Sequence, residues 1–494
     1  MSQLLSTGVA VAPVLVVLAL LSLRVPSLAA GAAGLVAALA GAVTVFRPDD
    51  DEVAAAVARL GPTVLEVALI LLGGVLLATA LSATGSRDHI AGWLERIGSG
   101  GDPVPAILLL VFGLTPFMES VTGFGLGVVI TAPLLVRMGL SPVRAVVVGL
   151  LGLVLVPWGS LGPGTLVAAE LGGRDVDALG YWSALLSLPI LVVSMVTVLV
   201  VVTGRSPARP GPPGARRRSA PTRPAARHIA LGAAVVATQW AVLVASNAVV
   251  GVAPSGIVAS AAVIALLLAV ARVRHGALPA ATGGVLRALV PFGVLLAGIL
   301  ATTGALSLAG HPPGTGWLTS PALWVLVAAL VALRVYATPG AGLGPLLRTA
   351  VGTWVPVAGN AIVFMAIGIV MATAGMAAHL AGLATGLGPA AVALTPAVGA
   401  LGGYLTGTNT GAAAMFSAAT TGTAAGLGAD GLIALAGQNV GGSFAIIVSP
   451  PRVALAVGVV LAGRTRLPGG ATRTLATAVV SATIVLCAVT AVLT

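Results

Sequence analysis

Long apolar runs alternate with short polar stretches along the whole 494-residue chain. Runs of about 18 or more predominantly apolar residues are long enough to cross a hydrocarbon core of about 30 Å as α-helices. The runs lack the short alternating segments of a transmembrane β-barrel. The pattern therefore predicts an all-α polytopic membrane protein with about 12–14 transmembrane helices.

Two clusters of apolar segments, at 104–137 and 389–447, are made of pieces too short to cross the bilayer singly. Each cluster has the same order: a break rich in glycine and polar residues, an apolar helix, a turn, another helix and a second glycine break. Membranes tolerate broken backbone where it lines a cavity or is covered by protein. We therefore expect broken helices or re-entrant hairpins in two inverted repeats, at about 104–170 and 389–452, as in secondary transporters.

A segment rich in arginine and proline, at 204–227, lies between the two repeats. Its prolines predict a flexible linker, and its arginines place it on the cytoplasmic side by the positive-inside rule. The linker divides the chain into an N-terminal transmembrane half, 1–203, and a C-terminal transmembrane half, 228–494.

Composition narrows the class of protein further. With 58% hydrophobic and 7% charged residues, the chain cannot cover a water-facing surface, so no soluble domain is expected. The net charge of +11 comes from arginines in loops, without the aromatic-interleaved basic face of a nucleic-acid partner. All 24 basic residues are arginine, a bias that points to a bacterial genome. We expect a multi-pass protein of the plasma (inner) membrane, embedded in the lipid bilayer and compatible with a homo-oligomer.

Glu119 is the only charged residue between positions 103 and 136. A charge inside the membrane is costly and marks a functional site by default. Because burial favours the neutral form of a carboxyl group, Glu119 is a candidate to bind and release a coupling proton. The structural alternative is a glutamate that hydrogen-bonds the broken helix on which it lies.

Polar groups around the breaks are candidates to bind a small anion. Glycines let backbone approach a ligand, and N–H groups at a helix start favour a carboxylate. Unwound carbonyls and hydroxyls at the second break could hold a cation, a carboxylate or a hydroxyl group. Packing breaks, helix caps and interhelical hydrogen bonds are the structural alternatives. The candidate substrate-binding residues are Ser120, Thr122, Gly123, Phe124, Gly125, Thr408, Asn409, Thr410, Gly411, Gln438, Asn439 and Ser443.

Motifs of membrane enzymes are absent from the sequence. It contains no HExxH zinc motif and no Walker A motif, and the GxGD pattern of membrane aspartyl proteases fails because Ala429 stands where that aspartate is required. Cys487 is alone and forms neither a disulfide framework nor a thiolate metal site. We therefore expect no enzyme activity, no cofactor and no resident metal.

Several segments resemble the L-lactate permease family. The segment ESVTGFGLGVVI, which begins at Glu119, is similar to the family's EGAAGFGxPVAI. The segment LGGYLTGTNTGAAAMF, at 401–416, is similar to GxFLTGS(N/D)TSSNxLFG, and the segments at 371–381 and 438–452 also resemble family motifs. The resemblance implies proton-driven import of lactate and related 2-hydroxycarboxylates by a fold of inverted repeats. It also implies Glu119 and 408–410 as site residues.

The chain departs from the family at several of these motifs. Gly127 replaces the family's proline, and the segment 153–163 lacks the family's Asn-Thr pair. The lysine before the Ile-Ser-Pro motif is also missing, so that the next cation is Arg452. We expect a site with these changes to hold a different or larger carboxylate than lactate.

The sequence predicts a secondary active transporter, a proton-coupled symporter of a small organic anion, either lactate or a related monocarboxylate or 2-hydroxycarboxylate. Arg137, Arg144 and Arg452 either attract this anion or mark membrane interfaces. One alternative is a Na⁺-coupled carboxylate transporter of the same fold, with cations at the two breaks. A second alternative is a channel or an assembly subunit.

Overall fold

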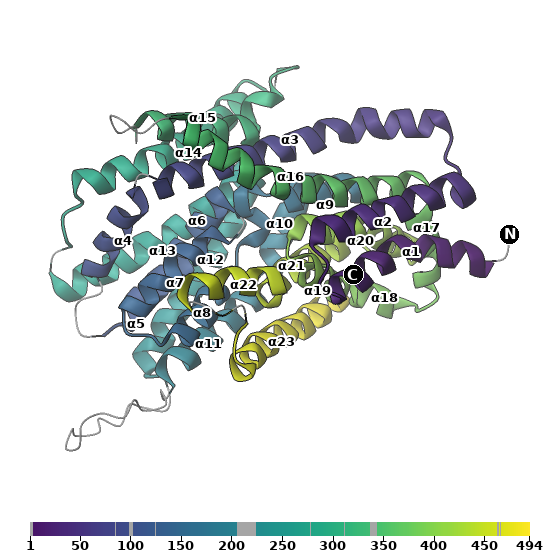
Figure 1. Cartoon of the computed structure of the whole chain (residues 1–494). Coiled ribbons are helices and arrows are strands. Elements are labelled where there is room, and N and C mark those ends of the chain that lie inside the picture. Colours follow the sequence, from purple (N-terminus) through teal and green to yellow (C-terminus); the bar gives the residue numbers. More distant parts are fainter. Residues whose placement is uncertain are drawn as a thin grey trace.

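The structure is a computed structural model, and it describes residues 3–83, 85–97, 102–123, 125–204, 224–276, 278–310, 312–335, 343–461, 464 and 466–494. Among these residues the chain forms helices and turns and no β-strand. The helices run roughly alongside one another in an elongated bundle (Figure 1). The predicted all-α class is therefore confirmed, whereas the linker predicted at 204–227 lies largely outside the described residues.

The chain before the linker forms α-helices, two π-helices (η1 and η2) and one 3-10 helix (η3). In chain order they are α1 (Gln3–Ser22), α2 (Ser27–Gly41), η1 (Ala42–Phe46), α3 (Asp50–Ala83), α4 (Ser86–Ile97), α5 (Val104–Leu108), η2 (Leu109–Leu114), α6 (Thr115–Thr122), α7 (Leu126–Arg137), α8 (Pro142–Leu151), η3 (Val156–Leu161), α9 (Pro163–Gly172), α10 (Val176–Leu186) and α11 (Leu188–Thr203).

The chain after the linker is equally helical, and η4 and η5 are short 3-10 helices. In chain order its elements are α12 (Ala226–Val250), α13 (Val252–His275), α14 (Gly283–Leu308), η4 (Gly316–Thr319), α15 (Pro321–Val335), α16 (Leu343–Thr373), α17 (Met376–Thr385), α18 (Pro389–Ala393), α19 (Thr395–Thr406), α20 (Asn409–Gly426), α21 (Gly431–Ala445), η5 (Ile446–Val448), α22 (Pro450–Val460) and α23 (Gly469–Leu493).

Many of these helices are suited to a bilayer. Within the described ranges, 10 helical stretches are long and apolar enough to cross a membrane, or up to 11 if the α10–α11 pair, bent by 41°, is one span. Shorter apolar helices accompany them, namely α7, α8, α15, α17 and α22. The expected 12–14 spans included the shorter helices α7, α8 and α15, which are not long enough to count among these 10 or 11 spans. The chain is thus a polytopic helical membrane protein.

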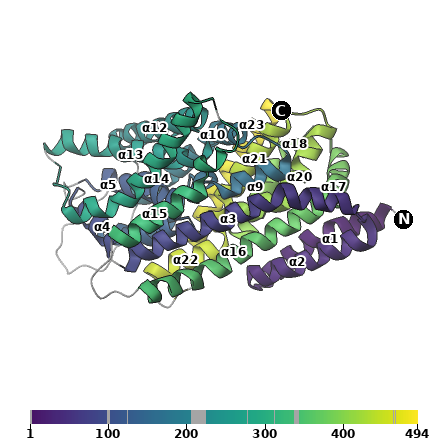
Figure 2. The same cartoon turned by 90° about the horizontal axis from the view of Figure 1, so that it is seen from above.

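The longest helix, α3, runs along the molecule and supports the region of the breaks (Figures 1 and 2). Asp50, Asp51 and Glu52 lie in its first turn, where negative charge stabilises a helix N-terminus. Gly73 lets α3 approach α15, because a Cβ atom there would lie 2.6 Å from the Val325 side chain. Small residues allow this kind of close packing between membrane helices.

The two clusters of short helices show the same order of elements. In the first, α6, a break, α7, α8, η3 and α9 follow one another; in the second, α19, a break, α20, α21, η5 and α22 do so. Helices of the two clusters also pack against each other: α9 of the first cluster packs against α20 of the second, and α22 of the second packs against α7 of the first (Figure 1). The two clusters therefore share one interface, and their relation as repeats stays a prediction.

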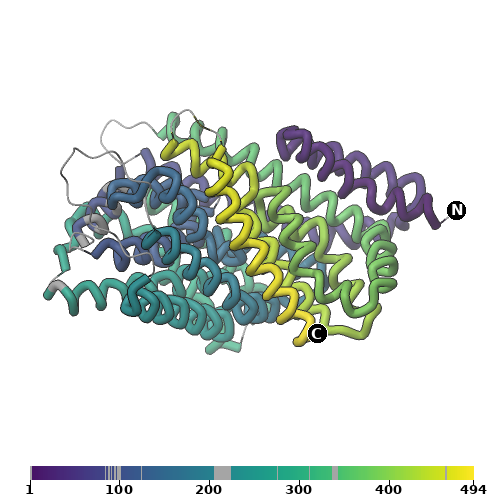
Figure 3. The backbone as a smooth tube through the Cα atoms, turned by 90° about the horizontal axis from the view of Figure 1, so that it is seen from below, coloured from purple at the N-terminus to yellow at the C-terminus, as the bar shows by residue number. Residues whose placement is uncertain are grey.

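Other helices enclose this interface. The helices α1 and α2 pair at the end of the molecule that carries the N-terminus, and α23 crosses the face seen in Figure 3, where it contacts α11 and α21. On another side, α13 packs against α6, η2 and η3. The neighbouring helix α12 contributes Gln239, whose amide donates a 3.0 Å hydrogen bond to the Phe112 carbonyl inside the π-helical turn. The first break is therefore held by helices from both halves of the chain.

Candidate functional site

The two breaks meet around a small cavity. Its walls come from α3, the first break, η3, the starts of α9 and α20, α16 and α22. The space amounts to about 50 Å³, more than the roughly 10–15 Å³ that a single water molecule requires. Five of the predicted site residues line it: Glu119, Gly123, Thr408, Asn409 and Thr410. The structure therefore brings the two breaks together, whereas their joint role as one binding site stays a prediction.

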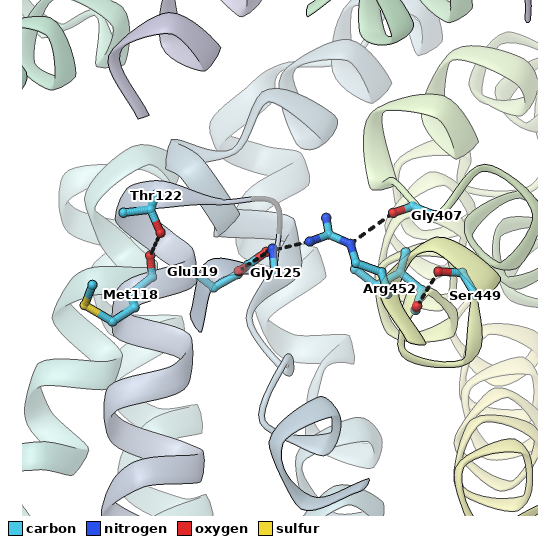
Figure 4. Close-up of polar contacts among 8 residues, drawn as sticks. Met118, Glu119, Thr122, Gly125, Gly407, Ser449 and Arg452 are labelled. Carbon is cyan, nitrogen blue, oxygen red and sulfur yellow. Dashed lines mark hydrogen bonds and ion pairs between the residues drawn. The ribbon is translucent and has the colours of Figure 1, made fainter. Parts of the chain in front are cut away.

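A buried ion pair spans the cavity between the two halves of the chain (Figure 4). Glu119, on α6, is 3% exposed, and Arg452, on α22, is 8% exposed. The Arg452 Nη1 atom lies 3.5 Å from Glu119 Oε1. The Gly125 N–H group, at the start of α7, donates to both carboxylate oxygens with N···O distances of 2.9 Å. The carboxylate is thus stabilised by a cation and by a helix N-terminus together.

Arg452 also contacts the second break. Its Nε–H group donates to the carbonyl oxygen of Gly407 at 3.2 Å, directly after α19 (Figure 4). These two contacts use two of the five N–H donors of a guanidinium group. The side chain is buried, so Arg452 does not lie at a membrane interface, which was one of the two sequence interpretations.

Glycines allow the backbone conformation of the breaks. Gly123 and Gly125 have φ angles of +67° and +83°, and Gly407 has a φ of +69°, a region that other residues rarely adopt. At Gly125 there is a second reason, because a Cβ atom would lie 2.7 Å from Arg452 Nη1. Glycine is therefore needed there both for the turn and for the ion pair.

The η3 break carries strain in a residue that is not glycine. Ser160 has a φ of +45° and is 2% exposed, and its neighbour Leu161 has a φ of +66°. Residues in this region cost free energy and are found at functional sites more often than elsewhere. Ser160 lines the cavity, and its Oγ atom has no hydrogen-bond partner among the described residues.

Four helix N-termini surround the site, in two pairs. The starts of α7 and α22 hold the Glu119 carboxylate, through Gly125 N–H and Arg452. The starts of α9 and α20 line the cavity with Pro163, Gly164, Asn409 and Thr410, and Glu119 is the only carboxylate among the described lining residues. First-turn N–H groups have no acceptor within their own helix and favour anions. The second pair of N-termini is therefore suited to an anionic ligand.

A chain of buried amides and hydroxyls joins the two repeats beside the cavity. The Asn409 Nδ2 group donates to Asn439 Oδ1 at 2.7 Å. The Asn439 Nδ2 group donates in turn to Thr165 Oγ1 at 3.1 Å and to Ser183 Oγ at 3.0 Å. Asn439, on α21, thus connects α20 with α9 and α10.

The structure places other predicted residues outside the cavity lining. Ser120 packs toward Gly256 of α13, and the Thr122 hydroxyl donates to the Met118 carbonyl of its own helix (Figure 4). The Gln438 amide donates to Ser417 Oγ at 3.2 Å.

Two further predicted residues form local contacts. The Gly411 N–H group donates to Thr408 Oγ1 at 3.0 Å, which caps α20, and the Ser443 hydroxyl donates to the Asn439 carbonyl. Phe124 lies outside the described residues. Of the arginines considered with Arg452, Arg144 donates to the Gly204 carbonyl and Arg137 lies in the last turn of α7, and neither lines the cavity.

Two polar lining residues, Ser160 and Asn360, were missing from the predicted set, and Arg452 was predicted only as an arginine that either attracts the anion or marks a membrane interface. Each is a single polar residue within an apolar or glycine-rich stretch, and this was the only signal that the sequence offered. Asn360, on α16, accepts a hydrogen bond from Ser27 Oγ at 2.6 Å, which fixes α2 against the site. Isolated polar residues in membrane helices face either a partner helix or a cavity, and sequence does not distinguish the two.

These features define a polytopic helical membrane protein with a buried ion pair between two broken helices. A family model described as L-lactate permease matches residues 6–209 and 314–494, most of the chain. The chain therefore belongs to the L-lactate permease family, and the predicted resemblance is confirmed. Among curated proteins, the L-lactate permease of Streptococcus iniae is 31% identical over 136 residues, which are 27% of this chain and 28% of that relative. This match thus spans little more than a quarter of the relative's length.

Proposed function

We propose that this protein is a secondary active transporter that carries a small monocarboxylate together with a proton across the plasma (inner) membrane of a bacterium. Membership of a permease family supports transport in preference to enzyme activity. The observation that carries the proposal is the Glu119–Arg452 pair in a cavity lined by two further helix N-termini. The proposal takes the two clusters of short helices as inverted repeats with the site at their interface, the arrangement found in secondary carriers.

The substrate carboxylate binds at the starts of α9 and α20. There it meets backbone N–H groups near Gly164 and Thr410 and the guanidinium group of Arg452. A guanidinium binds carboxylates in a forked, charge-assisted geometry. The substrate therefore competes with Glu119 for Arg452.

Proton coupling follows from the charge balance of a closed site. Without substrate, Glu119 and Arg452 form a neutral pair. One added carboxylate leaves a net charge of −1, and burial of an uncompensated charge is costly. Protonation of Glu119 restores neutrality, so the favoured translocated state holds one carboxylate and one proton.

A Glu119→Gln variant tests this coupling. In proteoliposomes, we expect the wild-type protein to accumulate lactate when an inward proton gradient is applied. The variant mimics a permanently protonated Glu119, so it should exchange lactate for lactate but lose gradient-driven accumulation. An Asp430→Asn variant, which changes a carboxylate that caps α21 away from the cavity, serves as the control.

Three outcomes would contradict parts of the proposal. Full gradient-driven accumulation by the Glu119→Gln variant would show that another group binds the proton. Uptake that requires Na⁺ at zero pH gradient would show sodium coupling instead. Flux that neither saturates nor shows counterflow would indicate a channel.

A further inference from the structure

A buried amide from α12 supports the helix that carries Glu119. Gln239 is fully buried, and its Nε2 group donates a 3.0 Å hydrogen bond to the Phe112 carbonyl oxygen in the π-helical turn η2. We propose that Gln239 is a positioning residue for proton coupling, because it holds the turn that directs Glu119 into the buried ion pair. This inference rests on the proposed transport function.

The Phe112 carbonyl lacks its usual donor. In an α-helix it would accept from the N–H group four residues later, and that residue is Pro116, which has no N–H group. Gln239 supplies a donor in its place from another helix. Because burial of a carbonyl without a donor is costly, this bond favours the turn in its present form.

The turn η2 sets the direction in which α6 presents its side chains. Its bonds reach five residues back, and both the N–H group and the hydroxyl of Thr115 donate to the Leu110 carbonyl. Such a turn holds one more residue than an α-helical turn, and each residue of an α-helix rotates the chain by about 100°. A shift of the turn by one residue would therefore rotate Glu119 by about 100°, away from Gly125 and Arg452.

Helix α13 packs closely against the same segment at two points. A Cβ atom at Gly113, in the turn, would lie 2.8 Å from the Ile264 side chain. A Cβ atom at Gly256 would lie 2.5 Å from the Ser120 hydroxyl oxygen, one position after Glu119. This packing and the Gln239 hydrogen bond favour the same rotation of α6, so loss of the bond leaves the packing alone to hold it.

Proton coupling depends on small movements of the Glu119 carboxylate. Its Oε1 atom lies 3.5 Å from Arg452 Nη1, and both of its oxygens accept from the Gly125 N–H group (Figure 4). A misplacement of about 1 Å can change a rate by about 100-fold. Exchange of substrate without net proton movement uses Arg452 and the starts of α9 and α20, so we expect it to be less sensitive.

A Gln239→Leu variant tests this assignment in proteoliposomes of the full chain. The readout is the rate of gradient-driven lactate uptake divided by the rate of lactate counterflow. Both rates count only folded protein, so a merely structural role lowers them alike and leaves the ratio unchanged. We expect the ratio to fall by about tenfold or more, towards that of the Glu119→Gln variant.

Gln438→Leu is the matched control. It removes an amide that is 1% exposed, donates to Ser417 Oγ and does not line the cavity. Its ratio should remain that of the wild-type protein. If Gln239→Leu does not fold, Gln239→Met takes its place, because methionine keeps the length of the side chain and has no N–H donor.

A thermodynamic cycle tests the origin of the effect. Pro116→Ala returns an N–H group to the position from which it can donate to the Phe112 carbonyl. In that background, Gln239→Leu should lower the melting temperature less than it does in the wild-type protein, because the carbonyl keeps a donor. Equal decreases in the two backgrounds would show that Gln239 does not replace the missing N–H group.

The outcomes separate this inference from the proposed function. If the wild-type protein accumulates lactate and a folded Gln239 variant keeps the wild-type ratio, the role assigned to Gln239 is wrong and transport stands. If Glu119→Gln keeps full gradient-driven accumulation, the proton role of Glu119 fails, and the role of Gln239 fails with it. If the wild-type protein neither exchanges nor accumulates lactate, the proposed function and this inference both fail.

Discussion

Glu119 and Arg452 show how a membrane protein can hold two charges in an apolar interior. The carboxylate receives Gly125 N–H and one guanidinium nitrogen, and the guanidinium also donates to the Gly407 carbonyl. Desolvation of two ions cancels much of their attraction, so such a pair contributes little net stability. We therefore propose that the pair is present between the two breaks for ligand and proton binding and not for stability.

An Arg452→Ala variant tests this view. Removal of the cation leaves Glu119 buried without a charge partner, which we expect to lower the free energy of unfolding by about 3–5 kcal/mol and to abolish lactate exchange. Thermal unfolding in detergent and counterflow measure the two effects. Arg473→Ala, which removes an exposed arginine on α23, is the control and should change stability by at most about 0.5 kcal/mol.

A double variant separates stability from function. Replacement of both Glu119 and Arg452 by leucine should restore most of the stability, since an apolar pair of similar volume is often as stable as a buried ion pair. It should not restore transport. A double variant that remains as unstable as Arg452→Ala would show that the pair itself stabilises the fold.

At the level of elements, a break in a helix leaves backbone N–H groups without partners inside the helix, so that they can bind other groups. The chain ends α6 and α19 at glycines with positive φ and restarts as α7 and α20, so that N–H groups and a polar side chain face the interface. Thr408 caps α20, and the Glu119 carboxylate receives an N–H group from the start of α7. Continuous helices would have used these N–H groups internally.

A Gly125→Ala variant tests the dependence of the site on this geometry. Alanine at φ +83° costs about 1–2 kcal/mol, and its Cβ would displace Arg452 from Glu119. We therefore expect lower thermal stability together with loss of lactate exchange. Gly139→Ala is the matched control, because Gly139 has a φ of +96° but nothing within 4 Å of a Cβ atom. If both variants lose transport equally, the contact with Arg452 is not the cause.

At the level of the whole molecule, contacts at the ends of candidate membrane spans also join segments far apart in the chain. Asp102, before α5, accepts a hydrogen bond at 2.9 Å from His228 Nε2 in the first turn of α12 and one at 3.2 Å from Val104 N–H. Arg227 lies 3.4 Å from the same carboxylate. Burial raises the pKa of Asp102, but the hydrogen bonds and the charges of His228 and Arg227 outweigh it and lower the pKa below 3.8.

The lowered pKa of Asp102 predicts a dependence of stability on acid pH. Because the folded-state pKa lies below the ordinary value of 3.8, the stabilisation is fully present above that value and is lost as pH falls through the folded pKa. An Asp102→Asn variant should therefore melt below the wild-type protein at neutral pH, and the difference should shrink below pH 3.8. A difference in melting temperature that stays constant with pH would contradict this assignment.

Much of this protein could be predicted from local patterns in its sequence. The apolar runs determine the helical membrane class, because each span needs only consecutive apolar residues. Glu119 and the glycine-rich breaks are visible as local exceptions to that pattern, and the family motifs lie in the same segments. The cavity residues Gly123, Thr408, Asn409 and Thr410 were predicted for this reason.

The partners of these residues were decided by the tertiary structure alone. Arg452 is 333 positions from Glu119, and Asn439 is 274 positions from Thr165. Hydrophobic pattern and motif spacing report on neighbours along the chain, whereas these pairs depend on how α22 packs on α7 and α21 on α9. For the same reason, the sequence could not show that Arg452 and Ser160 line the cavity or that Gln438 and Ser443 bond elsewhere. Local sequence thus determined where the helices break, and packing decided which polar groups meet at the breaks.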